Sequence, residues 1–354
     1  MSASPPTARP LDLALQGGGS HGAFTWGVLD RLLEDTSIEF SAISGTSAGA
    51  LNAAVLASGH GRGGREGART ALRAFWTDVS RAGAVFSPLV KVQNDLAGNA
   101  FGFGQLPGMQ WMNSFIHSLS PYDFNPLNLN PLRDVLHRHV DAHALQHCGI
   151  KVFVTATQVH TGQARMFTGT ELGIDALLAS ACLPFLYQAV VIDGEPYWDG
   201  GYTGNPALFP LIYDSGSLDL LLVRINPLRR DDTPRNSMDI LDRLSEITFN
   251  ASLIGEMRAI NFVSRLLRDR KLDPGHYKDL RMHMVADDAH LAPLGVNSKF
   301  TTDMPFLESL FTVGRNAATA WLHQHSKDVG VRSTLDIAAT FLGQAPATHN
   351  SPAT

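Results

Sequence analysis

The chain has 354 residues, a length that fits one large domain or two modest ones. Hydrophobic residues make up 44% and charged residues 17%, so the chain can bury a substantial core, which excludes a disordered or fibrous protein. With 28 Lys and Arg against 33 Asp and Glu, the net charge of −5 provides no general attraction to nucleic acid. The two cysteines, Cys148 and Cys182, exclude a disulfide framework and indicate buried thiols in a reducing compartment.

The N-terminal residues show no pattern of a targeting segment. Residues 1–10 carry three prolines and no apolar run, which argues against a secretory signal and predicts a flexible tail. No stretch approaches about 18 uninterrupted apolar residues, so we expect no membrane-spanning helix. These features predict a cytoplasmic protein without a nucleic-acid partner, and they leave peripheral membrane contact open.

Two strand–turn–helix units open the chain. The first is a mostly apolar strand over residues 11–16, followed by a glycine-rich loop and a helix over 23–33. The second is a strand over 40–44, followed by a turn of small residues and a helix over 50–57. Two such units in succession predict a parallel α/β sheet.

The rest of the chain alternates between helical and strand patterns. The predicted elements are an exposed loop over 59–67, strands over 152–158, 165–167, 190–192 and 218–225, and helices over 132–146, 175–181, 238–272 and 306–327. On the long helix, Ile240, Leu244, Ile247 and Leu253 fall on one side and many charges on the other, a typical amphipathic pattern.

Residues 45–49, Gly-Thr-Ser-Ala-Gly, fit the pattern G-x-S-x-G between a predicted strand and a predicted helix. A serine on such a sharp turn projects its hydroxyl out of the sheet, and the helix N-terminus favours developing negative charge. Gly45 and Gly49 leave room for the turn. Ser47 is therefore a candidate nucleophile, although small-residue turns between strand and helix are also common without catalysis.

Residues 17–22, Gly-Gly-Gly-Ser-His-Gly, form a second candidate motif that ends at Gly22. Its backbone N–H groups at a helix start could bind an oxyanion or a phosphate. The same residues satisfy G-x-G-x-x-G, but the acidic residue that a dinucleotide site expects after the next strand is missing. A turn that only lets a helix pack closely is the third interpretation.

Asp199 follows an apolar strand and precedes Gly200 and Gly201. An Asp before two glycines is most often an ordinary turn. It becomes a candidate catalytic base beside a serine that has no obvious histidine partner.

These three motifs, in this order, resemble the patatin-like phospholipase family over roughly residues 11–208. Residues 179–184, Ala-Ser-Ala-Cys-Leu-Pro, also look like a small-residue segment of that family. Two positions depart from the family pattern: His21 stands where many members carry Arg, and Gln16 replaces an acidic residue before the glycines.

The resemblance implies a three-layer α/β/α fold with a mostly parallel central sheet and a helical C-terminal part. It also implies a Ser–Asp dyad, with Ser47 as nucleophile and Asp199 as base, and an oxyanion hole made by the N–H groups of Gly17, Gly18 and Gly19. The implied activity is that of a serine acyl hydrolase acting on lipid or lysolipid esters through an acyl-enzyme, without metal or cofactor. With an ordinary pKa near ~4, Asp199 would be ionised at neutral pH and the rate would show no limb near pH ~6.5.

The resemblance also suggests a domain organisation. We expect a flexible tail over 1–10, a catalytic domain over 11–215, a strand and helices over 216–342 that pack on the same domain, and a disordered tail over 343–354. Residues 84–124 hold seven aromatic residues and only three charges, which fits a mobile apolar flap over an acyl site and equally fits ordinary burial.

His139, His143 and His147 are spaced so that one helix would align them on one face. Such a row can bind zinc, but the Glu of an H-E-x-x-H motif is missing. We therefore expect an ordinary helix face and no metal site.

Three alternative functions stay open at this point. An α/β-hydrolase esterase would need a Ser–Asp–His triad with a late histidine such as His283 or His290. A dinucleotide-binding protein would use Gly17, Gly19 and Gly22. A catalytically silent lipid-binding relative would keep the fold without the reaction.

Overall fold

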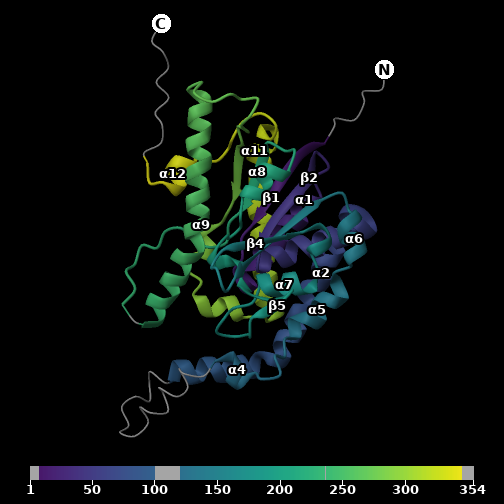
Figure 1. Cartoon of the computed structure of the whole chain (residues 1–354), viewed down its shortest axis with the longest axis vertical. Helices are drawn as coiled ribbons and strands as arrows, with labels where there is room; N and C mark the ends of the chain where they lie inside the picture. The colour runs from purple at the N-terminus through teal and green to yellow at the C-terminus, as the bar shows by residue number, and fades with distance from the viewer. Residues whose placement is uncertain (1–7, 100–119, 236, 345–354) are drawn as a thin grey trace.

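The computed structural model of the chain describes residues 8–99, 120–235 and 237–344 (Figure 1). Its centre is an eight-stranded sheet, in which seven strands follow the order β5-β6-β3-β2-β1-β7-β8. The eighth strand, β4, is outside this order and pairs with β3. The strands are β1 (Arg9–Leu15), β2 (Ile38–Thr46), β3 (Lys151–Gln158), β4 (Ala164–Thr168), β5 (Val190–Ile192), β6 (Glu195–Asp199), β7 (Asp219–Val223) and β8 (Arg281–Val285). β3, β2, β1, β7 and β8 run parallel, whereas β4, β5 and β6 pair antiparallel. The predicted mostly parallel α/β sheet is therefore confirmed.

Helices cover both faces of this sheet. They are α1 (Gly22–Leu33), α2 (Ala48–Asn99), α4 (Pro121–Phe124), α5 (Pro131–His139), α6 (Ala142–His147), α7 (Ile174–Ser180), α8 (Phe209–Asp214), α9 (Ser237–Arg268), α10 (Asp288–Leu291), α11 (Met304–His325) and α12 (Ile337–Phe341). Short 3-10 turns are η1 (Gly19–His21), η2 (Gly169–Glu171), η3 (Gly200–Tyr202), η4 (Val296–Phe300) and η5 (Ser326–Asp328). In Figure 1, α9 and α12 lie on one side of the sheet, and α2, α5 and α6 lie on the other.

The side chains of β7 show why three layers form. Leu221 and Val223 belong to one apolar core, whereas Leu220 and Leu222 belong to a second core on the opposite face. Successive residues of a strand point to opposite faces, so a strand buried on both sides reads as a continuous apolar run. The sheet is thus the middle layer of an α/β/α sandwich.

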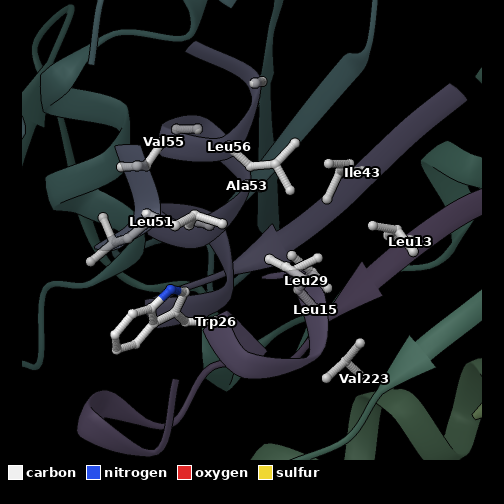
Figure 2. Packing of buried hydrophobic residues seen from close by; sticks show 14 of the residues in the cluster. Leu13, Leu15, Trp26, Leu29, Ile43, Leu51, Ala53, Val55, Leu56 and Val223 are labelled. Atoms are coloured by element: carbon white, nitrogen blue, oxygen red, sulfur yellow. The ribbon is translucent and has the colours of Figure 1, made fainter. Parts of the chain in front are cut away.

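The larger core lies between the sheet, α1 and α2, where Figure 2 shows the side chains of β1, β2 and β7 pointing toward both helices. Trp26 of α1 is fully buried there, and its ring centroid lies 4.1 Å from that of Phe311 in α11. The other core packs α8, α9 and α12 against the sheet. Residues 216–342 therefore contribute to both cores.

The predicted loop over 59–67 is wrong, because α2 passes through it. The backbone departs from helical geometry only at Gly63 and Gly64, where the two arms of the helix meet at a kink. A Cβ atom on Gly67 would lie 2.4 Å from the carbonyl oxygen of Gly59. These glycines therefore allow the two arms to approach closely. A sequence rich in glycine and arginine is compatible both with such a close helix contact and with a loop.

The single helix predicted over 132–146 is also wrong, because α5 and α6 are separate. Val140 and Asp141 have extended backbone between them. The Asp141 carboxylate accepts a hydrogen bond from Ala144 N at 3.0 Å and so caps the start of α6.

The N-terminal boundary also differs from the prediction. β1 begins at Arg9, so Arg9 and Pro10 belong to the sheet and not to the predicted tail over 1–10.

Three predicted segments lie partly or wholly outside the described residues. The backbone over 84–99 continues α2, and residues 100–119 lie outside, so the apolar flap over 84–124 stays a prediction. The same holds for the tails over 1–7 and 345–354. Among the helices of the described part, none is long and apolar enough to cross a bilayer.

Candidate active site

Ser47 lies on a strained turn between β2 and α2. Its φ of +52° is in the left-handed region, which non-glycine residues rarely adopt. A Cβ on Gly45 would lie 2.6 Å from Gly49 O, and a Cβ on Gly49 would lie 2.1 Å from Leu15 O. Both flanking positions therefore require glycine, and the strand–turn–helix geometry is that of a nucleophile elbow.

The Ser47 backbone is held from a third element. Its N–H donates a hydrogen bond to Ser180 Oγ at 2.9 Å, and Ser180 is fully buried at the end of α7. The sequence places Ser180 in a small-residue segment but does not indicate this role. The hydroxyl fixes the peptide at the turn, and so helps to hold the strained conformation.

Strand register brings Asp199 to Ser47. Thr46 pairs with Thr155 of β3, and Asp199 pairs with the next residue, Ala156, on the same edge of β3, because β4 occupies the opposite edge along residues 153–157. The two candidate residues therefore meet along one edge of β3, and both line the same cavity.

Asp199 is buried, with 2% of its surface exposed. Its Oδ1 accepts a hydrogen bond from Gly201 N at 2.7 Å. A Cβ on Gly200 would lie 2.1 Å from Thr155 O, so the glycine after Asp199 lets the chain turn closely against β3.

Burial raises the pKa of Asp199 to about 6, against the lowering effects of the Gly201 N–H, the Ser47 hydroxyl and the Lys299 charge. The expectation of an ordinary pKa is therefore wrong, because the sequence does not show how deeply the carboxyl group is buried. At pH 7 the ionised form still exceeds the protonated form by roughly ten to one.

The glycine loop packs directly on the elbow. A Cβ on Gly17 would lie 2.7 Å from Ser47 Cβ, and Gly19 has a φ of +58°. The Gly17 N–H, however, donates to Asn205 Oδ1 at 2.6 Å, so Gly17 cannot serve as an oxyanion donor in this arrangement. In the described part of the chain, the N–H groups of Gly18 and Gly19 make no hydrogen bond, and both glycines line the cavity next to Ser47.

Buried amide side chains hold this loop. Gln16 Oε1 accepts hydrogen bonds from Ile225 N and Asn226 N at 3.0 and 2.9 Å. Asn226 Nδ2 donates to Gly17 O at 2.7 Å, and Gln16 Nε2 donates to Asn250 Oδ1 at 3.2 Å. Sequence reasoning missed these amides; the one available signal was Gln16, a polar residue at the end of an apolar strand.

His21 does not reach the candidate site. Ser298 Oγ donates to Gly295 O at 2.5 Å, so His21 Nε2 must be the donor to Ser298 Oγ at 2.7 Å. Burial lowers the pKa of His21 to about 3, which keeps the ring neutral. His21, which stands where many members of the patatin-like family carry Arg, therefore links the glycine loop to η4.

A cavity of about 450 Å³ opens beside Ser47 and Asp199. Its walls are mostly apolar and include Leu51, Phe75, Trp76, Val79, Leu132 and Val135. Among the lining residues that the structure describes, Asp199 and Lys299 are the charged ones. An apolar cavity with a few convergent polar groups is suited to an acyl chain whose reacting group lies at the polar end.

The three spaced histidines do not form one row. His139 belongs to α5, where its Nε2 lies 2.9 Å from Asp78 Oδ2, and the break at Val140 separates it from His143 and His147 on α6. In the described residues, no group of three or more His, Cys, Asp or Glu side chains is arranged to hold a metal ion.

The histidines that a triad would need are engaged elsewhere. His283 is buried between Asp219 Oδ1, at 3.1 Å, and Thr334 Oγ1, at 2.9 Å. His290 is exposed and lies 2.9 Å from Asp287 Oδ2. Neither residue lines the cavity that holds Ser47.

The solved structures that match this chain include bacterial proteins. VipD from Legionella pneumophila is 14% identical with a TM-score of 0.41, covering 91% of this chain and 68% of VipD. The type III effector ExoU is 16% identical with a TM-score of 0.31, covering 90% of this chain and 53% of ExoU, so this chain spans about half of that protein. The ExoU–SpcU heterodimer of Pseudomonas aeruginosa gives 17% identity and a TM-score of 0.30, over 99% of this chain and 68% of the other. No curated protein matches the sequence.

The family comparison covers the part of the chain that carries all three motifs. Residues 13–212, more than half of the chain, match the family described as patatin-like phospholipase. The match includes the glycine loop, Ser47 and Asp199, and it ends before α9 and η4. The chain therefore belongs to the patatin-like phospholipase family, whose members are hydrolases of lipid esters.

Proposed function

We propose that the protein hydrolyses phospholipid or lysophospholipid esters with a Ser47–Asp199 dyad, through an acyl-enzyme on Ser47. The observation that carries this proposal is the placement of the strained Ser47 beside the buried Asp199 in the wall of one apolar cavity. The family match supports the substrate class.

In the first step, Asp199 acts as the general base. Its carboxylate takes the proton of the Ser47 hydroxyl as Oγ attacks the ester carbonyl carbon. Negative charge develops on the carbonyl oxygen, which the N–H groups of Gly18 and Gly19 can stabilise. Donors of this kind contribute ~3–4 kcal/mol each in enzymes where one has been removed.

The intermediate then collapses. The bond to the leaving alcohol breaks, and the alcohol oxygen takes the proton from Asp199, which leaves the acyl group on Ser47. In the second half, Asp199 takes a proton from a water molecule, and the resulting attack releases the fatty acid and returns the proton to Ser47 Oγ.

Exposed apolar side chains of α9 and of the segment after α7 suggest where a lipid surface would lie, because both parts of the chain also contribute to the cavity lining. Leu244 and Ile247 of α9 are 54% and 50% exposed, while Phe249 of the same helix lines the cavity. Phe185, 80% exposed, lines it from the segment after α7. We propose that these residues contact the membrane surface from which the substrate is taken.

The apolar side predicted for the long helix consists of one buried part and one exposed part. Leu253 is fully buried against the sheet, whereas Ile240, Leu244 and Ile247 face solvent. These three exposed residues therefore do not pack in the core, and we propose membrane contact as their role.

The test of the dyad is covalent labelling with a fluorophosphonate probe, combined with hydrolysis of a soluble ester. Ser47→Ala should abolish both labelling and turnover, and Asp199→Asn should lower kcat/KM by about 10²–10⁴-fold. Ser309→Ala, at an exposed serine of α11, is the matched control and should label like the unmodified protein. Full labelling of a folded Ser47→Ala variant would rule out the proposal.

A further inference from the structure

Lys299 lies against the catalytic machinery although η4 is outside the family match. Its carbonyl oxygen would lie 2.3 Å from a Cβ on Gly19, so η4 packs directly on the glycine loop. With Phe300 and Thr302, Lys299 also lines the cavity that holds Ser47. This part of the chain therefore completes the site rather than forming a separate unit.

The Lys299 ammonium determines how an active-site amide is oriented. Lys299 Nζ donates to Asn226 Oδ1 at 2.9 Å, and Asn226 Nδ2 donates to Gly17 O at 2.7 Å. An ammonium group has donors and no acceptor, so it requires the oxygen of the amide and leaves the NH₂ group for the glycine loop. Asn226 Nδ2 also donates to Gln16 Oε1 at 3.3 Å, so Lys299 supplies the donor for the amide oxygen while Gly17 and Gln16 accept from the NH₂ group.

Lys299 lines the same cavity as the candidate base, and its positive charge lowers the pKa of Asp199. Burial raises the pKa of the nearby Cys182 and Tyr202 to about 12 each, so both stay uncharged in the neutral range.

The other charged groups near Lys299 are already paired. Glu246 of α9 accepts hydrogen bonds from Arg230 and from Arg243. His21 is neutral because burial lowers its pKa to about 3. The carboxylate of Asp199, by contrast, is paired with no Arg side chain in the described part of the chain.

We propose that Lys299 is a positioning residue for ester hydrolysis: it orients the Asn226 amide that holds the glycine loop, and its charge stabilises the carboxylate of Asp199. The inference rests on the proposed dyad and adds a residue that the matched family region does not contain. Because Lys299 opposes the effect of burial on Asp199, its removal raises the pKa of Asp199 further. The acid limb of kcat/KM then moves to higher pH, since less of the base is ionised at any given pH.

The experiment compares full-length variants in the hydrolysis of a soluble ester across pH 5–9. Lys299→Met should lower kcat/KM at pH 7 at least ~10-fold and move the acid limb up by about one pH unit. Lys299→Arg, which keeps charge and donors, should leave the limb in place and recover part of the rate. Asn226→Ala removes the contact with the glycine loop and the acceptor of Lys299 but keeps the Lys299 charge, so it should lower kcat and move the limb less than Lys299→Met does.

Lys271→Met is the matched control, at an exposed lysine away from the cavity, and should change neither rate nor limb. Thermal unfolding is measured for every variant. An unchanged rate and limb in Lys299→Met would overturn the inference. So would a rate lowered equally at all pH values together with a lowered melting temperature, because that result shows a structural role alone.

The same assay also includes the variants Ser47→Ala and Asp199→Asn. Their activities distinguish a failure of this inference from a failure of the proposed dyad. If both lose activity while Lys299→Met matches the unmodified protein, only the role of Lys299 is wrong. If Ser47→Ala keeps its activity, the dyad itself is wrong.

Discussion

Ser47 and Asp199 lie next to each other along one edge of β3, where Thr46 pairs with Thr155 and Asp199 with Ala156, and no histidine is among the described residues that line their cavity. Asp199 is both the candidate base and one of the most deeply buried carboxyl groups of the described residues. Its ionisation therefore couples catalysis, pH dependence and stability, and the consequences can be measured separately.

The pH dependence of kcat/KM should show an acid limb near pH 6. Burial raises the pKa of Asp199 to about 6, and the dyad works only with the ionised carboxylate, so the rate falls as pH drops through that value. An imidazole would give a limb at a similar pH. The two are distinguished by temperature, because carboxyl ionisation has a small enthalpy and imidazole ionisation a large one. A limb that moves strongly with temperature, or a His283→Gln or His290→Gln variant that is folded and inactive, would contradict the dyad.

The stability of Asp199→Asn should exceed that of the unmodified protein at pH 7. A carboxyl group whose pKa is raised on folding binds its proton more tightly in the folded state, so its contribution to stability falls as pH rises from ~4 to about 6. The amide removes the buried charge that causes this loss. Thermal unfolding should thus show a higher melting temperature for the variant at pH 7 and a difference close to zero at pH 4. Equal melting temperatures at pH 7 would show that the burial of Asp199 costs no stability.

The glycine loop should tolerate alanine differently at its two candidate donor positions. At Gly18 the nearest atom to a new Cβ is Cδ1 of Ile225, a flexible side-chain end, whereas at Gly19 it is a backbone carbonyl and φ is positive. Gly19→Ala should therefore lower kcat more than Gly18→Ala, with a smaller effect of either on KM. Steady-state kinetics of the two folded variants measure this. Calorimetry with NAD serves as the control for a dinucleotide site, and saturable binding that either substitution removes would favour that alternative.

Chain length should control the rate until the cavity is filled. Each methylene group buried against walls such as Leu132 and Val135 contributes ~0.8 kcal/mol, so kcat/KM should rise from acetate to longer acyl esters and then level off. Leu132→Trp, which fills part of the cavity, should move the levelling point to shorter chains. A flat profile in the unmodified protein would show that this cavity does not bind the acyl chain.

Membrane contact should depend on the exposed residues of α9. A Leu244→Ser/Ile247→Ser variant loses two exposed apolar side chains of α9 and should bind phosphatidylcholine vesicles at least ~10-fold more weakly, while it hydrolyses a soluble ester normally. Val331→Ser, at a side chain that is 71% exposed and does not line the cavity, is the matched control. Unchanged vesicle binding, or a fall in melting temperature because these residues pack against another part of the chain, would exclude the proposed surface.

The local sequence was sufficient for the strand–turn–helix units and for both candidate catalytic residues. Apolar runs that end in glycine or small residues predict buried strands and tight turns from short-range sterics alone, and β1, β2 and the turn at Ser47 follow this rule. The same local view failed at residues 59–67, because glycine serves equally well in a loop and at a close helix contact.

Tertiary structure alone decided how these residues meet and what they can do. The pairing of β6 beside β3 places Asp199 next to Ser47, and the resulting burial raises its pKa, an effect that depends on every neighbour and not on the sequence around it. Asn226 and Lys299 reach the glycine loop from segments that carry no motif, because a buried polar group needs a partner wherever the fold places one. Motifs are local in sequence, whereas desolvation and hydrogen-bond partners are properties of the whole packed chain.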